Sequence, residues 1–295
     1  MLMIVLASTV MFFIAKKSPQ KDYTELNARI NSWWVMFGIV SVCVFLGEMA
    51  LICLFAVISF LALNEYFSLN NKTLTDKPLK TCAYIAIPIQ YFWVSIEWYG
   101  LFVIFIPVYM FLFIPFVKVF RGETEGFLKI VGTMHWGLML AVFSLSHLAY
   151  LIVLPESVNP AGSIALMLFL LVLTQFNDVA QFLWGKLLGK HKISPHVSPN
   201  KTTAGLNGGI VTITLLASFI GPWLTPMNVV QSVGAGLIIS IGGFIGDLTM
   251  SAIKRDIGIK DTGSLLPGHG GILDRVDSLT FSAPLFFHYL YYLHY

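Results

Sequence analysis

Long apolar segments recur along almost the whole chain, and they restrict the fold more than any other feature of the sequence. The segments of spanning or near-spanning length lie at about 2–15, 33–47, 49–63, 82–96, 100–117, 130–153, 162–184, 206–225, 229–250 and 278–294. A helix needs about 20 apolar residues to cross a bilayer, and a compact bundle tolerates somewhat fewer. The sequence therefore predicts an all-α integral membrane protein, a polytopic helical bundle with eight to ten transmembrane helices.

The composition agrees with lipid as the main solvent of this chain. Hydrophobic residues make up 57% of the sequence and charged residues only 11%. Residues 1–15 are apolar but are followed, not preceded, by Lys16 and Lys17, so we expect a membrane segment that is retained, not a cleaved signal peptide. No second domain or repeat is apparent, which predicts a single membrane domain over 1–295. The net charge of +3 gives no indication of nucleic-acid binding.

The basic residues predict the orientation in the membrane. All 18 Lys and Arg residues fall into five groups, and with the segments above all five groups face the same side. The groups are Lys16, Lys17, Lys21 and Arg29; Lys72, Lys77 and Lys80; Lys118, Arg121 and Lys129; Lys186, Lys190, Lys192 and Lys201; and Lys254, Arg255, Lys260 and Arg275. Because positively charged loops stay inside, this side is expected to be the cytoplasmic face.

Two acids lie inside apolar segments on that side. Asp178 precedes Lys186 by eight residues and Asp247 precedes Lys254 by seven. At 1.5 Å per helical residue, both carboxylates lie on the order of 11 Å below the basic loops. An intramembrane acid needs a partner, a proton or a cation, so equal depth favours a shared cation site. The alternative is two unrelated carboxylates that bond to neighbouring helices. The GxxxG spacings of Gly205/Gly209 and Gly242/Gly246 favour close helix packing.

The stretch 251–278 combines acids, bases and glycines between two apolar segments. Its acids supply hard oxygen ligands of the kind that Mg²⁺ takes, its bases suit phosphate oxygens, and its glycines allow tight backbone turns. With Asp247 just before the stretch, the residues concerned are Asp247, Asp261, Asp274 and Asp277; Lys254, Arg255, Lys260 and Arg275; and Gly263, Gly268, Gly270 and Gly271. This combination favours phosphoryl or nucleotidyl transfer, although a solvated, self-neutralising loop has a similar composition. No GxxxxGK[ST] phosphate loop is present.

A second polar loop, 186–205, follows Asp178 and is expected on the same face. It holds four lysines and two Ser-Pro steps, at Ser194 and Ser198. A patch that binds anionic lipid headgroups would have the same charge. His269 lies between glycines and is expected either to carry a proton or donate to phosphate, or to bond within the turn.

The stretch SAIKRDIGIKDTGSLLPGHGGILDRVD, from Ser251 to Asp277, resembles the signature of the phosphatidate cytidylyltransferases, also called CDP-diacylglycerol synthases. Residues 177–202 resemble a second block of that family, and Gly246–Leu248 resembles the lead-in to the signature. The resemblance is dense over about 174–277, which is therefore the expected catalytic half.

The resemblance implies that phosphatidic acid and CTP react to give CDP-diacylglycerol and pyrophosphate, assisted by Mg²⁺ with a second cation nearby. It implies metal binding by Asp247 and Asp274, with Asp178 and Asp261 as further acids of the site. It implies that nucleotide and lipid phosphates are held by Lys201, Lys254, Arg255, Lys260 and Arg275. Ser198 matches a Ser-Pro-x-Lys-Thr block, and His269, Gly270 and Gly271 complete the expected site. The expected location is a bacterial-type inner membrane, with the active site on the cytoplasmic face.

Two positions depart from the family pattern and leave other functions open. Gln181 stands where many members have a small residue, and Ala204 stands where many have Glu. A paralogue that uses a different phospholipid acceptor would look similar, as would a lipid-binding scaffold with a decayed site. A transporter with intramembrane Asp sites is a further alternative, whereas the DGxxAR…GxxxD…D pattern of CDP-alcohol phosphatidyltransferases is absent. A homodimer through the glycine-rich helices is also compatible with the sequence.

Overall fold

The computed structural model describes residues 9, 23–70, 76–156, 158–159, 161–263, 268 and 270–295. Most of these residues are helical, and the strands among them form one short hairpin. The predicted segment at 2–15 lies outside the described residues except for residue 9, and His269 also lies outside them.

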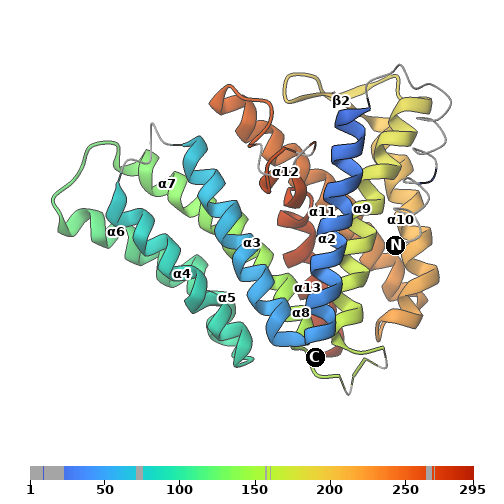
Figure 1. Cartoon of the computed structure of the whole chain (residues 1–295), viewed down its shortest axis with the longest axis horizontal. Helices are drawn as coiled ribbons and strands as arrows, with labels where there is room; N and C mark the ends of the chain where they lie inside the picture. Colours follow the sequence, from blue (N-terminus) through green and yellow to red (C-terminus); the bar gives the residue numbers. More distant parts are fainter. Residues whose placement is uncertain are drawn as a thin grey trace.

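The first half of the chain forms long helices that alternate in direction (Figure 1). Gly47, with a φ of 98°, separates the first two of these helices and lets the chain reverse. Asp76 caps the third helix by accepting a hydrogen bond from the backbone N–H of Leu79 at 3.2 Å. The elements are α2 (Thr24–Leu46), α3 (Glu48–Leu69), α4 (Lys77–Ser95), the rod of α5 (Tyr99–Ile104), η1 (Phe105–Met110) and α6 (Phe111–Phe120), and the rod of α7 (Phe127–Leu138), η2 (Met139–Phe143) and α8 (Ser144–Ile152).

The second half contains three long helices, a hairpin and two shorter helices. Its elements are α9 (Ser163–Leu188), β1 (Lys192–Ser194), β2 (Ser198–Thr202), α10 (Thr203–Leu224), α11 (Val229–Ile257), α12 (Leu273–Val276) and α13 (Leu279–His294). The hairpin is antiparallel, with Lys192 opposite Thr202. Thr202 also caps α10, because its Oγ1 accepts a hydrogen bond from the Gly205 N–H at 3.1 Å. The chain therefore passes directly from the hairpin into α10.

Seven helices in the described part of the chain are long and apolar enough to cross a membrane. They are Asn27–Leu46, Glu48–Leu69, Tyr99–Phe120, Phe127–Ile152, Ser163–Leu188, Thr203–Leu224 and Val229–Ile257. α13 has only 16 residues, and α4 carries Lys77, Lys80 and an internal Pro88. The mostly helical membrane architecture is thus confirmed, whereas the predicted count of eight to ten spans is not.

α3, α4, α9 and α13 pack around α8, whose nine residues are all buried. α9, α10 and α11 pack against one another, and α13 lies between α11 and α8. Large apolar side chains such as Phe45, Phe120 and Trp223 remain mostly exposed on the outside of the bundle. Apolar side chains both in the core and on the outer surface are expected when the surrounding solvent is lipid.

The two ends of the bundle differ. In Figure 1 the hairpin and α12 lie at the upper end, and the C-terminus lies at the lower end. The turns at Gly47 and at 225–228 join helices at the lower end, whereas the connection from α6 to α7 lies at the upper end. The basic connections that the structure describes therefore gather at the end that carries the hairpin.

Candidate active site

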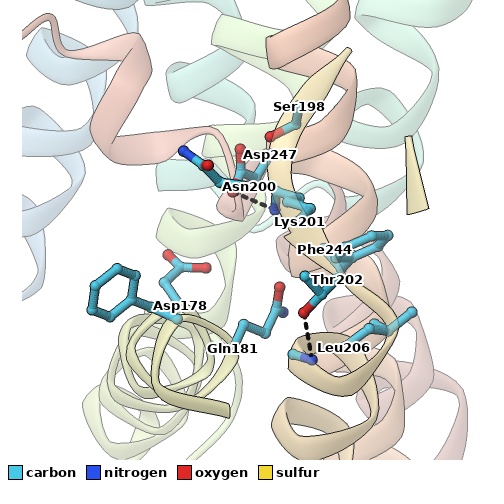
Figure 2. Close-up of a pocket in the computed structure, with 11 residues that line it drawn as sticks. Asp178, Gln181, Ser198, Asn200, Lys201, Thr202, Leu206, Phe244 and Asp247 are labelled. Atoms are coloured by element: carbon cyan, nitrogen blue, oxygen red, sulfur yellow. Dashed lines mark hydrogen bonds and ion pairs between the residues drawn. The ribbon is translucent and has the colours of Figure 1, made fainter. Parts of the chain in front are cut away.

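A pocket lies where α9, α10 and α11 meet the hairpin (Figure 2). Its volume is about 240 Å³. It is lined by Asp178, Gln181, Phe182, Ser198, Asn200, Lys201, Thr202, Gly205, Leu206, Phe244 and Asp247. The lining thus combines two acids and a lysine with apolar side chains, and it draws on four separate elements.

Small residues on α10 bring α9 close enough to form this pocket. A Cβ at Gly205 would lie 2.7 Å from the backbone oxygen of Gln181, and one at Gly209 would lie 2.6 Å from the Gln181 side chain. Asn177 on α9 donates a hydrogen bond to the carbonyl of Ser240 on α11 at 3.2 Å. The close packing predicted from the GxxxG spacing is confirmed, because larger residues at these glycines would push the helices apart.

Asp178 on α9 and Asp247 on α11 both line the pocket. The two acids, which the sequence predicts at equal depth below the basic loops, therefore lie in one common site. Asp178 accepts a hydrogen bond from the Ser278 hydroxyl, at 2.9 Å to one carboxylate oxygen and 3.2 Å to the other. Asp247 accepts a weaker one from Ser251 at 3.4 Å. Each acid keeps some solvent exposure, so ligand access is retained.

Lys201 on β2 reaches into the same pocket. Its Nζ lies 2.5 Å from Asp247 Oδ2 and 4.7 Å from the centroid of the Phe244 ring. The ring face attracts the ammonium group, and the carboxylate neutralises it. The hairpin therefore delivers a cation directly to the acids of the helices.

The turn after α12 carries a third acid to this region. A Cβ at Gly246 on α11 would collide with the backbone oxygen of Asp277, so glycine is needed where this turn touches the helix. Burial raises the pKa of Asp277 well above its ordinary value, and the negative charges of Asp247 and Asp178 raise it further. Three carboxylates thus share one negative region, which a cation would stabilise.

Lys254 and Asp274 form a second ion pair next to the first. Lys254 Nζ lies 2.8 Å from Asp274 Oδ1, and both side chains are largely buried. Asp274 Oδ2 also accepts hydrogen bonds from the N–H and hydroxyl of Thr262, both at 2.9 Å, and from the Gly271 N–H at 3.2 Å. Burial alone would raise the pKa of Asp274, but Lys254 and Thr262 outweigh it and hold the pKa below its ordinary value. Asp274 therefore fixes the fold of the signature loop.

The remaining predicted residues surround these pairs. Arg255 donates to the carbonyls of Val197, at 3.3 Å, and Ile259, at 3.1 Å, and so ties the hairpin to α11. Lys260 and Asp261 are exposed. Ser198 lines the pocket.

Arg275, Gly270 and Gly271 are the other predicted site residues of the signature that the structure describes. Arg275 is partly buried, and its Nε has no hydrogen-bond partner among the described residues. Gly270 has a φ of 81° and lies against Asp274, whereas Gly271 lies against Glu65, so both need to be glycine.

Glu65 and Thr262 belong to this region but were not singled out from the sequence. Glu65 lies in α3, far along the chain from the signature, and accepts hydrogen bonds from Ile272 and Leu273. A signal for it exists, because an acid inside an otherwise apolar helix is expected to have a specific role. No comparable signal marks Thr262, whose neutral side chain acts through its contact with Asp274.

Within the described residues, no group of three or more His, Cys, Asp or Glu forms a ready metal cage. Mg²⁺ does not require one, since it commonly uses one or two carboxylates together with water and substrate phosphates. The donor set at Asp178 and Asp247, with Asp277 nearby, supplies hard oxygen atoms in a region of negative charge. These residues fit an Mg²⁺ ion that arrives with a phosphate ligand.

Comparison with known sequences identifies the family. The chain matches the cytidylyltransferase family over residues 27–293. This chain belongs to the cytidylyltransferase family. The chain is therefore an enzyme of the nucleotidyltransferase class, and the resemblance drawn from the signature is confirmed.

Individual relatives agree with the family assignment. The chain is 44% identical over 290 residues to the uncharacterized protein YnbB of Escherichia coli K12, covering 98% of this chain and 95% of that protein. It is 44% identical over 125 residues to a phosphatidate cytidylyltransferase of Staphylococcus aureus (strain COL), covering 40% of this chain and 46% of that protein. A phosphatidate cytidylyltransferase of Staphylococcus epidermidis (strain ATCC 35984) is 41% identical over 120 residues, with the same coverage of 40% and 46%. The match thus spans less than half of the staphylococcal proteins.

Proposed function

We propose that this enzyme transfers the cytidylyl group of CTP to phosphatidic acid, giving CDP-diacylglycerol and pyrophosphate. An oxygen of the lipid phosphate forms a bond to the α-phosphorus of CTP, and the bond from that phosphorus to the oxygen leading to the β-phosphate breaks. The observation that carries the proposal is the meeting of Asp178, Asp247 and Lys201 in one pocket. The names of the staphylococcal relatives support the same lipid acceptor and a place in phospholipid biosynthesis.

The acids of the pocket are the proposed metal ligands. Asp178 and Asp247 would hold Mg²⁺, with Asp277 close enough to contribute. Bound Mg²⁺ supplies a Lewis acid that offsets negative charge on phosphate oxygens. Asp274 and Asp261 remain predicted acids of the site. In this structure Asp274 already accepts hydrogen bonds from Lys254 and Thr262. A second cation stays part of the proposal.

The basic residues are proposed to bind and orient the phosphates. Lys201 is placed to exchange its contact with Asp247 for a phosphate oxygen, because its Nζ already lies in the pocket. Lys254 lies in the last turn of α11 and Arg275 lies in α12, and both would offset charge on the leaving pyrophosphate. Further contacts are proposed for Arg255, Lys260, Ser198, His269 and the N–H groups of Gly270 and Gly271.

The site is proposed to face the cytoplasm of a bacterial-type inner membrane. The basic connections gather at the end that carries the pocket, as the positive-inside rule requires for a cytoplasmic end. CTP is available there. We infer further that the catalytic half at about 174–277 functions within one membrane domain. A homodimer stays a proposal, but the glycines of the GxxxG spacings already contact Gln181, Ser282 and Asp277 of the same chain, so two copies would have to associate through another surface.

A different phospholipid acceptor is the alternative. Gln181 lines the pocket, and its buried Nε2 has no hydrogen-bond partner among the described residues. An amide N–H without a partner in the pocket that is proposed to receive the phospholipid favours a ligand with an additional oxygen, which can accept its hydrogen bond. An acceptor with a headgroup beyond the phosphate would supply that oxygen.

The test is mass spectrometry of the lipid product formed by the purified full-length protein with CTP and Mg²⁺. Phosphatidic acid should give CDP-diacylglycerol, and Asp247→Asn should reduce its formation at least about a hundredfold. Glu156→Gln, an exposed position at the opposite end, should leave the rate unchanged. A CDP-lipid formed only from another phospholipid would establish the alternative acceptor. Labelled-solute flux without CTP consumption would favour a transporter, and lipid binding without turnover would favour a scaffold.

A further inference from the structure

Glu65 is a buried acid that the proposed chemistry does not use directly. It lies in the last part of α3, and only 9% of the residue is exposed. Burying a carboxylate is unfavourable unless specific partners stabilise it. Within the described part of the chain, no Lys or Arg forms an ion pair with Glu65. Its partners must therefore be found among neutral groups.

Those partners are two backbone N–H groups of the signature. Ile272 donates to Glu65 Oε2 at 2.8 Å, and Leu273 donates to Oε1 at 3.1 Å. These N–H groups stand at the start of α12, where backbone donors lack a partner within the helix. Glu65 satisfies them from a helix more than 200 residues away in sequence. Through these hydrogen bonds α3 is in contact with α12, and Figure 1 shows where the two helices lie in the fold.

Two signature glycines leave room for this carboxylate. A Cβ at Gly271 would collide with Glu65 Oε1, and one at Gly263 would lie 3.2 Å from Oε2. The signature loop therefore meets the Glu65 carboxylate at two glycines, and at Gly271 an added side chain would not fit without a shift of the contact. This fit indicates that the loop is shaped around Glu65.

The contact lies directly before the residues that reach the pocket. Gly271 N–H donates to Asp274, which pairs with Lys254. Four residues further on, Ser278 donates to Asp178 in the pocket. Because α12 is only one turn long, a shift of the backbone at 271–273 is passed on to Asp277 and Ser278.

We propose that Glu65 is a positioning residue for cytidylyl transfer, which holds the start of α12 so that the turn after it meets Asp178 and Asp247. The inference rests on the proposed function. Glu65 itself touches neither nucleotide nor lipid in this account. Its loss should therefore lower kcat by misplacing the signature turn, while the affinity for CTP changes little.

The test compares Glu65→Gln with Glu48→Gln, an exposed position at the other end of the same helix. Glu65→Gln keeps the size of the side chain but replaces one accepting oxygen with an NH₂ group. We expect kcat to fall about tenfold to a hundredfold, the KM for CTP to stay within about threefold, and Glu48→Gln to behave like the wild type. Amide hydrogen exchange over residues 268–277 should become faster in Glu65→Gln only, with an unchanged melting temperature.

Several outcomes would overturn the inference. A folded Glu65→Gln variant with wild-type kcat and unchanged exchange over 268–277 would do so. A raised KM with unchanged kcat would assign Glu65 to binding, and a lowered melting temperature without a loss of kcat would assign it to stability alone. If the wild type shows no turnover, the proposed function fails, and exchange alone then decides whether Glu65 holds the loop.

Discussion

At the residue scale, the site is a set of charges that compensate one another before any ligand arrives. Lys201 neutralises Asp247, Lys254 neutralises Asp274, and Ser278 donates to Asp178. Asp277 forms no ion pair among the described residues, and its burial, together with the negative charges of Asp247 and Asp178, raises its pKa. An arriving metal–triphosphate would add positive charge to the acids and negative charge to the lysines, so both sets of contacts can be exchanged.

Lys201 provides the first prediction at this scale. Lys201→Met removes the cation from the pocket and leaves Asp247 without its partner, so kcat/KM for CTP should fall about a hundredfold to a thousandfold. Lys192→Met, an exposed lysine on the other strand of the hairpin, should keep wild-type kinetics. Steady-state assays with varied CTP measure both variants. Equal losses in the two would show that hairpin charge in general matters, not the Lys201 contact.

The sequence predicted for some of these residues, but not for others, which groups they lie next to. Asp178 and Asp247 could be paired in advance because both lie in helices, where residue number converts directly into depth. Glu65 could not be paired, because its partners are backbone N–H groups on a loop whose path no local pattern specifies. Asp277 was recognised as an oxygen donor, but its position near the pocket depends on how the turn after α12 meets α11.

At the element scale, α11 organises the candidate active site. Its glycines contact Asp277, Ser278 and the start of α13, and Asp247 and Phe244 on the same helix line the pocket. α11 continues to Ile257, beyond the apolar segment that ends at 250, and stops at Gly258 with a φ of 80°. Lys254 and Arg255 in its last turn are favourable at the negative end of the helix dipole. The first part of the signature is therefore helical and not a loop.

Gly246 provides the prediction at this scale. Gly246→Ala places a methyl group against the Asp277 carbonyl, so it should destabilise the protein by about 1–3 kcal/mol and lower kcat. Gly132→Ala is the matched control, because nothing lies within 4 Å of the added Cβ on α7. Thermal unfolding in detergent, followed alongside turnover, measures both. A Gly246→Ala protein as stable and active as Gly132→Ala would contradict the tight contact between α11 and the turn.

The hairpin shows what periodicity could not reveal. The strands of 192–202 are short and polar, with two Ser-Pro steps, and so lack the alternating apolar pattern that marks a strand. Their pairing is supported by contacts made elsewhere, namely the Arg255 bond to Val197 and the cap that Thr202 provides to α10. The sequence showed a basic loop after Asp178, and tertiary contacts made it a hairpin.

At the scale of the whole molecule, alternating helices separate a basic end with the pocket from a less charged end with the C-terminus. Apolar segment length predicted most of this arrangement, because lipid requires helices to satisfy their own backbone hydrogen bonds. The number of spans was harder to predict, since α4 and α13 are borderline in length or composition. α8 is buried among other helices, which replace lipid as its environment, whereas α13 buries only part of its surface.

Cysteine accessibility in intact bacterial cells tests the orientation. In a background without Cys43, Cys53 and Cys82, Lys192→Cys should react with a membrane-impermeant maleimide only after permeabilisation. Glu156→Cys, at the opposite end, should react in intact cells. The reverse pattern would place the pocket on the outer face, where CTP is not available.

The central claim is that acids from separate helices jointly hold a divalent metal against a triphosphate. Electron paramagnetic resonance of Mn²⁺, used in place of Mg²⁺, measures this directly as bound metal with and without CTP. Wild type and Glu156→Gln should bind Mn²⁺ more tightly in the presence of CTP, and Asp178→Asn and Asp247→Asn should each weaken that binding at least about tenfold. CTP-dependent Mn²⁺ binding of equal strength in all four proteins would contradict the account.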